Sequence, residues 1–130
     1  MIVPKYTREI PQRLRLEAGS CTKCGFIAFP PRRICPSCAG IEFKQISLKP
    51  EGKVITYTLI RVAAEEFALQ VPYVVAIIET LEGARLTTQV VDCIPEEVAI
   101  DSEVILMTRK IQTEGNAGIY QYGYKAILKR

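Results

Sequence analysis

The sequence contains no histidine, and this absence limits the chemistry that the protein can perform. Histidine is the side chain whose ordinary pKa lies nearest to neutral pH, so the commonest general base is missing. Long apolar runs are also missing, since none approaches the about 18 residues that a membrane-spanning helix needs. The first residues, MIVPKYTREIPQ, show neither an apolar signal core nor a small-residue cleavage site. We therefore expect a cytoplasmic protein that does not cross a membrane.

The remaining composition, with 48% hydrophobic and 24% charged residues in a chain of 130, is typical of one globular domain with a small accessory module. The net charge of +3 is unevenly distributed. Residues 1–50 hold nine Lys/Arg and three Glu, whereas residues 51–130 hold eight Lys/Arg and eleven Asp/Glu. An acidic C-terminal part repels phosphate, so this charge pattern disfavours nucleic acid as a partner.

Four of the five cysteines occur as two Cys-x-x-Cys pairs within the segment CTKCGFIAFPPRRICPSC. These four residues, the predicted metal ligands, are Cys21, Cys24, Cys35 and Cys38. Two such turns supply the four sulfur ligands of a tetrahedral zinc site, and four protein ligands leave no position for a substrate or water. The pattern predicts one structural zinc, and iron in the same site remains an alternative. Disulfides between these cysteines are disfavoured, because disulfides belong to secreted chains. A redox-active Cys-x-x-Cys motif is also disfavoured, because such motifs usually occur singly.

The fifth cysteine, Cys93, ends an apolar strand-like segment and is interpreted as a small buried hydrophobe rather than a nucleophile. The pairs of acidic residues in the C-terminal part are interpreted as solvent-exposed surface residues. Without histidine or an activated nucleophile, we expect no independent enzyme activity.

Alternating and β-branched segments predict an all-β chain made of a rubredoxin-like zinc ribbon followed by a five-stranded OB-fold barrel. Residues 1–20 form a lead-in, with a short helical turn between Pro4 and Pro11 and a strand near Leu14, Leu16 and Ala18. Residues 21–47 form the ribbon and residues 48–130 the barrel. Glycines that allow bends are expected at Gly52 and Gly123, and a helical turn at residues 95–97 separates the third and fourth strands. The barrel strands are predicted at residues 52–62, 73–81, 84–92, 103–111 and 119–129, with a glycine-rich turn at 114–118.

Two segments carry candidate contact residues for a partner or for CoA. In the ribbon these are Phe29, Pro30, Pro31, Arg32 and Arg33, where two prolines stiffen the chain before two arginines. Such arginines can hold a phosphate or a partner carboxylate, although a solvated hairpin tip is an equally good interpretation.

The other segment is the loop at residues 63–72, which places Phe67 among acids. This ring can fold back onto the barrel mouth, or it can contact a partner or an acyl chain. The alternative of a single-stranded nucleic-acid module rests on Tyr120, Tyr122 and Tyr124, which can stack bases, but fold analogy alone is a weak argument.

Three segments together, CTKCGFIAFPPRRICPSC, PYVVAIIETLEGARLTTQVVD and GIYQYGYKAIL, resemble a family of small zinc-ribbon/OB-fold proteins associated with acyl-CoA enzymes. This family was formerly a domain of unknown function, and the resemblance covers the chain from about Leu14 onward. It implies a non-catalytic partner of thiolase-fold enzymes. In archaea it implies a scaffold between acetoacetyl-CoA thiolase and hydroxymethylglutaryl-CoA synthase, at the entry to the mevalonate pathway, that lines part of a CoA or acyl-CoA site.

The resemblance also implies that the four cysteines of the two pairs are the zinc ligands and that Phe29-Pro30-Pro31-Arg32 is a family landmark. Two features depart from the pattern. The helical N-terminal arm is reduced to about a dozen residues, and Asp101 stands where glycine is common. An accessory subunit of another thiolase-like enzyme is the alternative within the same class.

Overall fold

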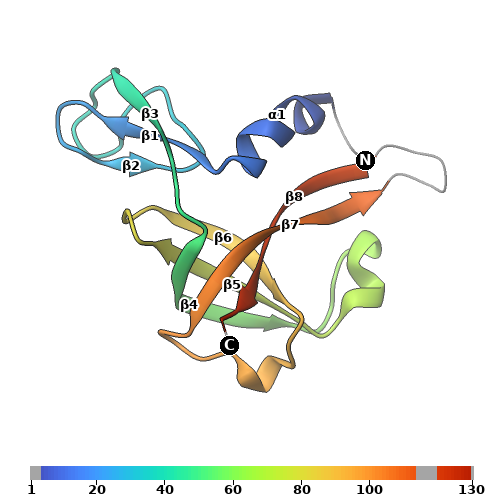
Figure 1. Cartoon of the computed structure of the whole chain (residues 1–130). Coiled ribbons are helices and arrows are strands. Elements are labelled where there is room, and N and C mark those ends of the chain that lie inside the picture. Colours follow the sequence, from blue (N-terminus) through green and yellow to red (C-terminus); the bar gives the residue numbers. More distant parts are fainter. Residues whose placement is uncertain (1–3, 114–119, 130) are drawn as a thin grey trace.

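The computed structural model describes residues 4–113 and 120–129, and it contains a small sheet, one α-helix and a barrel (Figure 1). The all-β class and the order of ribbon and barrel are confirmed. In chain order the elements are α1 (Pro4–Leu14), β1 (Glu17–Cys21), β2 (Ile27–Ala28), β3 (Phe43–Ser47), β4 (Glu51–Ile60), η1 (Glu65–Gln70), β5 (Tyr73–Thr80), β6 (Arg85–Val91), η2 (Pro95–Glu97), β7 (Glu103–Thr113) and β8 (Tyr120–Leu128).

The N-terminal helix α1 is longer than the short turn predicted from the sequence. It spans 11 residues and includes Pro11, which removes one backbone donor. The helix nevertheless continues, because the Arg15 amide donates to the Pro11 carbonyl at 3.1 Å and Arg13 pairs with Glu9 at 3.0 Å. It also packs against β8, and tertiary packing of this kind supplies most of the stability of short helices.

The strand predicted near residues 14–18 begins later, because Leu14 belongs to α1 and is exposed. β1 covers Glu17–Cys21 and lies between β2 and β3 in a three-stranded antiparallel sheet. Strand β3 was not predicted. Its exposed positions outnumber the half-buried ones, so it lacks a clear alternating pattern.

The barrel closes in the order β4-β5-β6-β8-β7, with β7 returning to β4. Neighbouring strands are antiparallel except for β6 and β8, which pair in parallel at residues 90–91 and 126–127. This is the five-stranded Greek-key barrel of an OB-fold. The helical turn η2 lies where the sequence predicted it, and the predicted glycine-rich turn at 114–118 falls outside the described residues.

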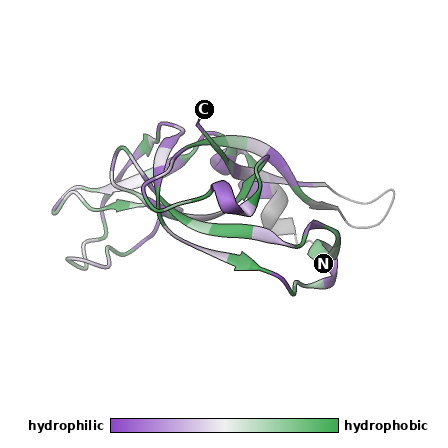
Figure 2. Ribbon diagram, turned by 90° about the horizontal axis from the view of Figure 1, so that it is seen from below, coloured by the Kyte–Doolittle hydropathy of each residue, from purple (hydrophilic) through white to green (hydrophobic). Residues whose placement is uncertain are grey.

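Alternate residues of β5 and β6 are buried in the barrel interior, and Figure 2 shows hydrophobic residues along the barrel strands. Fully buried side chains at its centre include Val54, Ile78, Val104 and Ala126. The register shifts between Val54 and Thr56 in β4, and again in β7 near the partner of Gly123. Such irregularities bend strands strongly enough to close a small barrel.

The ribbon and the barrel share one hydrophobic core. Leu16, Phe29 and Leu48 join the buried cluster of the barrel residues, and the Phe29 ring lies 5.5 Å from the Tyr124 ring. The amide of Lys49 donates to the Glu82 carboxylate at 3.0 Å, which ties the connection to the β5–β6 turn. The ribbon is therefore held against the barrel. In the described ranges no helix is long and apolar enough to span a membrane.

Candidate metal centre and adjoining grooves

The first Cys-x-x-Cys pair lies on a tight turn between β1 and β2. The Gly25 amide donates to the Cys21 carbonyl at 3.0 Å, and the Cys21 amide donates to the Phe26 carbonyl at 2.8 Å. Gly25 adopts a φ of 79°, a left-handed conformation that glycine reaches without strain. The turn thus directs Cys21 and Cys24 toward the same point.

The second pair repeats this arrangement almost bond for bond. The Ala39 amide donates to the Cys35 carbonyl at 2.9 Å, and the Cys35 amide donates to the Gly40 carbonyl at 2.8 Å. Ala39 occupies the position equivalent to Gly25 and has a φ of 59°. The structure thus builds two equivalent turns from sequences that share only their cysteine spacing.

The two turns bring all four sulfur atoms together, with every pair within 4.8 Å. Cys21 Sγ lies 3.6 Å from Cys38 Sγ, and Cys24 Sγ lies 3.5 Å from Cys35 Sγ. Sulfurs at about 2.3 Å from a tetrahedral zinc are separated by about 3.8 Å, so the cluster fits zinc closely. A Cβ at Gly40 would lie 3.3 Å from Cys38 Sγ, so glycine at this position avoids a close contact with the sulfur cluster.

The electrostatics of the cluster favour a bound cation. Hydrogen bonds from the Cys24 and Lys23 amides lower the pKa of Cys21 to about 6. The Gly40 amide also lowers the pKa of Cys38, but the sulfurs of Cys24 and Cys21 outweigh it and the pKa lies at about 12. Four thiolates at these distances repel one another, and a divalent cation allows all of them to lose their protons.

Replacing Gly25 by alanine should weaken zinc binding about fivefold. Its Cβ would meet nothing within 4 Å, so the cost comes only from the left-handed backbone, about 1 kcal/mol. Competition with a chromophoric chelator measures the affinity. The reverse change Ala39→Gly removes the same strain and is the matched control, expected to leave zinc binding equal or tighter. Equal affinities of G25A and the wild type would refute this reading of the turn.

Beside the metal centre, the ribbon and the barrel enclose a groove of about 620 Å³. Phe29, Pro30 and Arg32 line it from the ribbon, and Ile55 and Ile77 are among the barrel residues opposite. A second hollow of about 380 Å³ continues from it on the ribbon side, and Arg32 lines both.

The ribbon contact residues predicted from the sequence therefore divide into two groups. Phe29 is only 8% exposed and forms part of the groove wall, with its ring packed on the barrel. Pro30, Pro31, Arg32 and Arg33 are exposed, and Arg32 faces the groove. The structure thus presents prolines and arginines on a base that Phe29 fixes.

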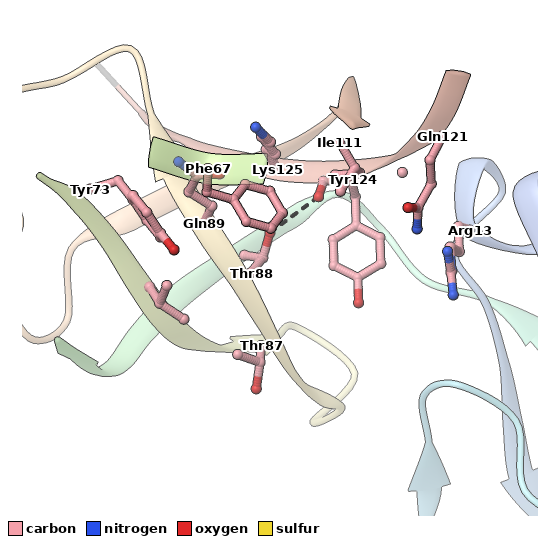
Figure 3. Close-up of a pocket in the computed structure, with 12 residues that line it drawn as sticks. Arg13, Phe67, Tyr73, Thr87, Thr88, Gln89, Ile111, Gln121, Tyr124 and Lys125 are labelled. Carbon is pink, nitrogen blue, oxygen red and sulfur yellow. Dashed lines mark hydrogen bonds between the residues drawn. The ribbon is translucent and has the colours of Figure 1, made fainter. Parts of the chain in front are cut away.

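The predicted residue Phe67 lies elsewhere, in a cavity of about 350 Å³ on the other side of Tyr124 (Figure 3). Its ring lies 6.3 Å from that of Tyr73, so it folds back onto the barrel mouth. Thr87 and Tyr124 line both this cavity and the groove. Phe67 and the ribbon residues therefore face two neighbouring hollows rather than one site.

Two cationic residues of this cavity were missed in the sequence. Arg13 enters from α1, and Lys125 comes from β8 and is only 8% exposed. Burial lowers the pKa of Lys125, with a further contribution from Arg109 and Lys110. No pattern in the sequence predicts that either residue lines the cavity, because α1 reaches it only through its packing on β8.

The tyrosines considered for base stacking do not form a free face. Tyr124 is half-buried against Phe29, and burial raises its pKa, partly offset by Arg13. Tyr122 is exposed, and the side chain of Tyr120 lies outside the described part of the chain. The strand that would stack bases is therefore partly covered by the ribbon.

A closed four-cysteine ribbon joined to a five-stranded barrel defines a zinc-ribbon/OB-fold protein. Residues 8–42 match the family described as the rubredoxin-like zinc ribbon domain of ChsH2, and residues 45–109 match the C-terminal OB-fold domain of ChsH2. The chain belongs to this family.

Its relatives include proteins named DUF35 domain-containing scaffold protein. One from Methanocaldococcus jannaschii is 46% identical over 95% of this chain and 89% of its own length. One from Methanothermobacter thermautotrophicus is 41% identical over 91% of this chain and 90% of its own. The benzoylsuccinyl-CoA thiolase subunit BbsA of Thauera aromatica is 28% identical over 85% of this chain and 74% of its own.

Among solved structures, the Ltp2-ChsH2(DUF35) aldolase contains a similar chain. It has a TM-score of 0.69 and 26% identity and covers 94% of this chain and 91% of that chain. The fold and the ribbon-then-barrel order recur there.

Proposed function

We propose that this protein is a non-catalytic scaffold subunit that bridges acetoacetyl-CoA thiolase and hydroxymethylglutaryl-CoA synthase in the cytoplasm, at the entry to the mevalonate pathway. The observation that carries the proposal is the 46% identity to a protein named as a scaffold, over 95% of this chain. Holding two enzymes together raises the effective concentration of the shared intermediate without any new chemistry.

The chemistry of the metal centre supports a non-catalytic role. Its four cysteines fill the coordination of zinc, so no position remains for a substrate or an activated water. The chain contains no histidine that could act as a general base. What the bound zinc supplies is rigidity, because it joins the two turns that flank the proline–arginine segment.

The groove beside the ribbon supports docking through the predicted contact residues. Arg32 borders a hollow whose barrel wall includes the apolar side chains of Ile55 and Ile77. An apolar wall with an arginine at its edge suits a partner segment that ends in a carboxylate, or an acyl-CoA chain with its phosphates. In this arrangement the subunit lines part of the CoA site of its partner, and Phe67 belongs to the neighbouring cavity.

Replacing Arg32 by glutamate should weaken binding to one partner enzyme by about 10- to 100-fold, since it removes a cation and adds a repulsive charge. Lys44→Glu is the matched control, because Lys44 is exposed on β3 and lines none of the hollows described above. Surface plasmon resonance with each purified enzyme measures both variants. Equal losses in the two variants would show that net charge, rather than the groove, controls binding.

A second candidate is an accessory subunit of a single thiolase-like enzyme, favoured by the likeness to BbsA, named as a thiolase subunit. Co-expression distinguishes the two. A scaffold gives one gel-filtration peak that contains the chain with both enzymes, whereas an accessory subunit leaves the synthase in a separate peak.

A further inference from the structure

We propose that Arg32 of the ribbon and Arg85 of the barrel form a phosphate-binding site, which we name the Arg32–Arg85 site, and that bound zinc is needed to assemble it. Its ligand is a phosphate or diphosphate group, carried either by an acyl-CoA of the proposed partner enzymes or by a free phosphate ester. The inference deepens the proposed function, on which it rests for the acyl-CoA source. It adds a second arginine, a ligand class and a dependence on zinc.

The two arginines line the same two hollows from separate modules. Arg32 and Arg85 both border the groove of about 620 Å³ and the adjoining hollow of about 380 Å³. Arg32 lies in the segment that joins the two cysteine turns, and Arg85 is the first residue of β6. Figure 1 shows the ribbon facing the end of the barrel where β5 turns into β6. The junction between ribbon and barrel is therefore lined by one cation from each module.

Nearby acids neutralise only part of this charge. In the part of the chain that the structure describes, no Asp or Glu lines either hollow. Glu79 pairs with Arg85, but this bond engages only the Nε atom, at 3.0 Å, and leaves the terminal Nη groups without a partner among the described residues. The Glu82 carboxylate accepts the Lys49 amide instead. Because Arg32 makes no ion pair with a described residue, the junction keeps a net positive charge and free guanidinium donors.

Two guanidinium groups from separate modules suit a phosphate better than a carboxylate. A single guanidinium can engage both oxygens of a carboxylate, because the two groups are planar and match in their spacing. A phosphate ester has three acceptor oxygens and a charge of about −1.5 to −2, so it can accept hydrogen bonds from a second arginine on another side. A phosphate group therefore uses both arginines, whereas a carboxylate needs only one.

The groove beside the two arginines has room for the organic part of such a ligand. Its wall includes Phe29 and Pro30 from the ribbon and Ile55 and Ile77 from the barrel. The volume of about 620 Å³ lies within the range of small-molecule sites, which are mostly apolar with a few polar groups that fix the orientation of the ligand. The phosphate thus lies at the arginines and the organic chain extends along the groove.

Bound zinc controls the position of Arg32, although Arg32 is not a ligand. The segment that carries Arg32 begins after Cys24 and ends before Cys35, and both cysteines belong to the four-sulfur cluster. Without the metal the two ends of this segment are released, and ordering Arg32 opposite Arg85 then costs conformational entropy on binding. Zinc and phosphate binding are therefore coupled, and each should strengthen the other.

Isothermal titration calorimetry of the full, zinc-loaded chain in phosphate-free buffer tests the site with three probes, which are pyrophosphate, acetyl-CoA and S-acetylpantetheine. We expect the two phosphate-bearing probes to bind, and S-acetylpantetheine, which lacks phosphate, to bind at least tenfold more weakly than acetyl-CoA. Arg32→Gln and Arg85→Gln should each weaken both phosphate-bearing probes at least tenfold, since each removes charge-assisted hydrogen bonds. Arg85→Lys keeps the charge without the planar fork, so its affinity should fall between those of the wild type and Arg85→Gln.

Arg61→Gln is the matched control, because Arg61 is exposed and lines neither hollow. It removes the same charge and should leave every affinity within about twofold. The melting temperature and the zinc content of each variant are measured first. Neither should change, since all three arginines are exposed and a surface ion pair contributes little to stability.

Cys38→Ser should lose pyrophosphate binding together with zinc, and binding of wild-type strength would contradict the coupling. The site is overturned if the wild-type chain binds neither phosphate-bearing probe, if the Arg32 and Arg85 variants bind as the wild type does, or if Arg61→Gln loses as much affinity as they do. S-acetylpantetheine that binds as tightly as acetyl-CoA would overturn the ligand class.

The same titrations distinguish the two sources of phosphate and separate this site from the bridge. Acetyl-CoA that binds at least tenfold more tightly than pyrophosphate assigns the phosphate to acyl-CoA, and equal affinities assign it to free phosphate compounds. The titrations contain no enzyme. A chain that binds phosphate but does not join thiolase and synthase therefore keeps the site and loses the proposed function, and the reverse result loses only the site.

Discussion

Replacing Cys38 by serine should abolish zinc binding and unfold the ribbon while the barrel remains folded. Zinc binding to small four-ligand modules is worth on the order of 10–16 kcal/mol, and the ribbon sheet has few buried side chains of its own. Elemental analysis should find one zinc per wild-type chain and none in C38S. Proton NMR should show dispersed barrel signals alongside collapsed ribbon signals.

The matched control for this change is Cys93→Ser. Cys93 is the fifth cysteine and packs against the barrel core, outside the four-sulfur cluster. It should keep one zinc per chain, although its stability can fall. Retention of zinc by C38S would contradict the closed four-cysteine centre, and equal amounts of iron and zinc in the purified protein would contradict the choice of metal.

Replacing Gly52 by alanine should destabilise the barrel by about 3 kcal/mol, a large fraction of the stability of a small domain. The added Cβ would lie 2.7 Å from Ile78 Cγ2 and 2.8 Å from the Glu79 carbonyl oxygen. Ile78 is fully buried, and the Glu79 oxygen belongs to the neighbouring strand, so neither can yield without moving the β4–β5 pair. The midpoint of urea unfolding measures the change.

Gly123→Ala is the control for Gly52→Ala. Its Cβ would lie 3.1 Å from Ile111 Cγ1, a side-chain atom of a half-buried residue that can turn aside. We expect a loss of about 1 kcal/mol or less. A Gly52 variant as stable as the Gly123 variant would show that the close approach of β4 and β5 is relaxed in solution.

The metal centre could be predicted from the sequence because its information is local. Two Cys-x-x-Cys turns determine ligand number and type, and the equivalent hydrogen bonds at Cys21 and Cys35 need no distant residues. The barrel could also be predicted, since its strands alternate and its breaks coincide with glycine and proline. In both cases the pattern lies within short, continuous segments of the chain.

The structural features that the sequence did not predict depend on contacts between segments that are distant in the chain. Helix α1 contains Pro11, which local propensity counts against a helix, and it forms by packing on β8. The same packing brings Arg13 to the cavity beside Tyr124 and Lys125. Strand β3 is specified by pairing with β1 rather than by its own pattern. Tertiary contacts of this kind are not readable from one sequence.

The zinc, the shared core and the proline–arginine segment form one mechanical unit. Zinc fixes the two turns, and Phe29 packs on Tyr124 and thereby fixes the ribbon against the barrel. Arg32 then stands at a defined place on the groove. Loss of zinc should therefore remove the partner that docks on the ribbon even though no zinc ligand touches that partner.

The most direct test of the bridge is light scattering coupled to gel filtration on purified thiolase and synthase, mixed with and without this chain. The account predicts one species whose mass includes all three proteins when the chain is present, and two separate enzymes when it is absent or carries C38S. Thiolase and synthase that associate equally well without the chain, or that stay separate in its presence, would contradict the account.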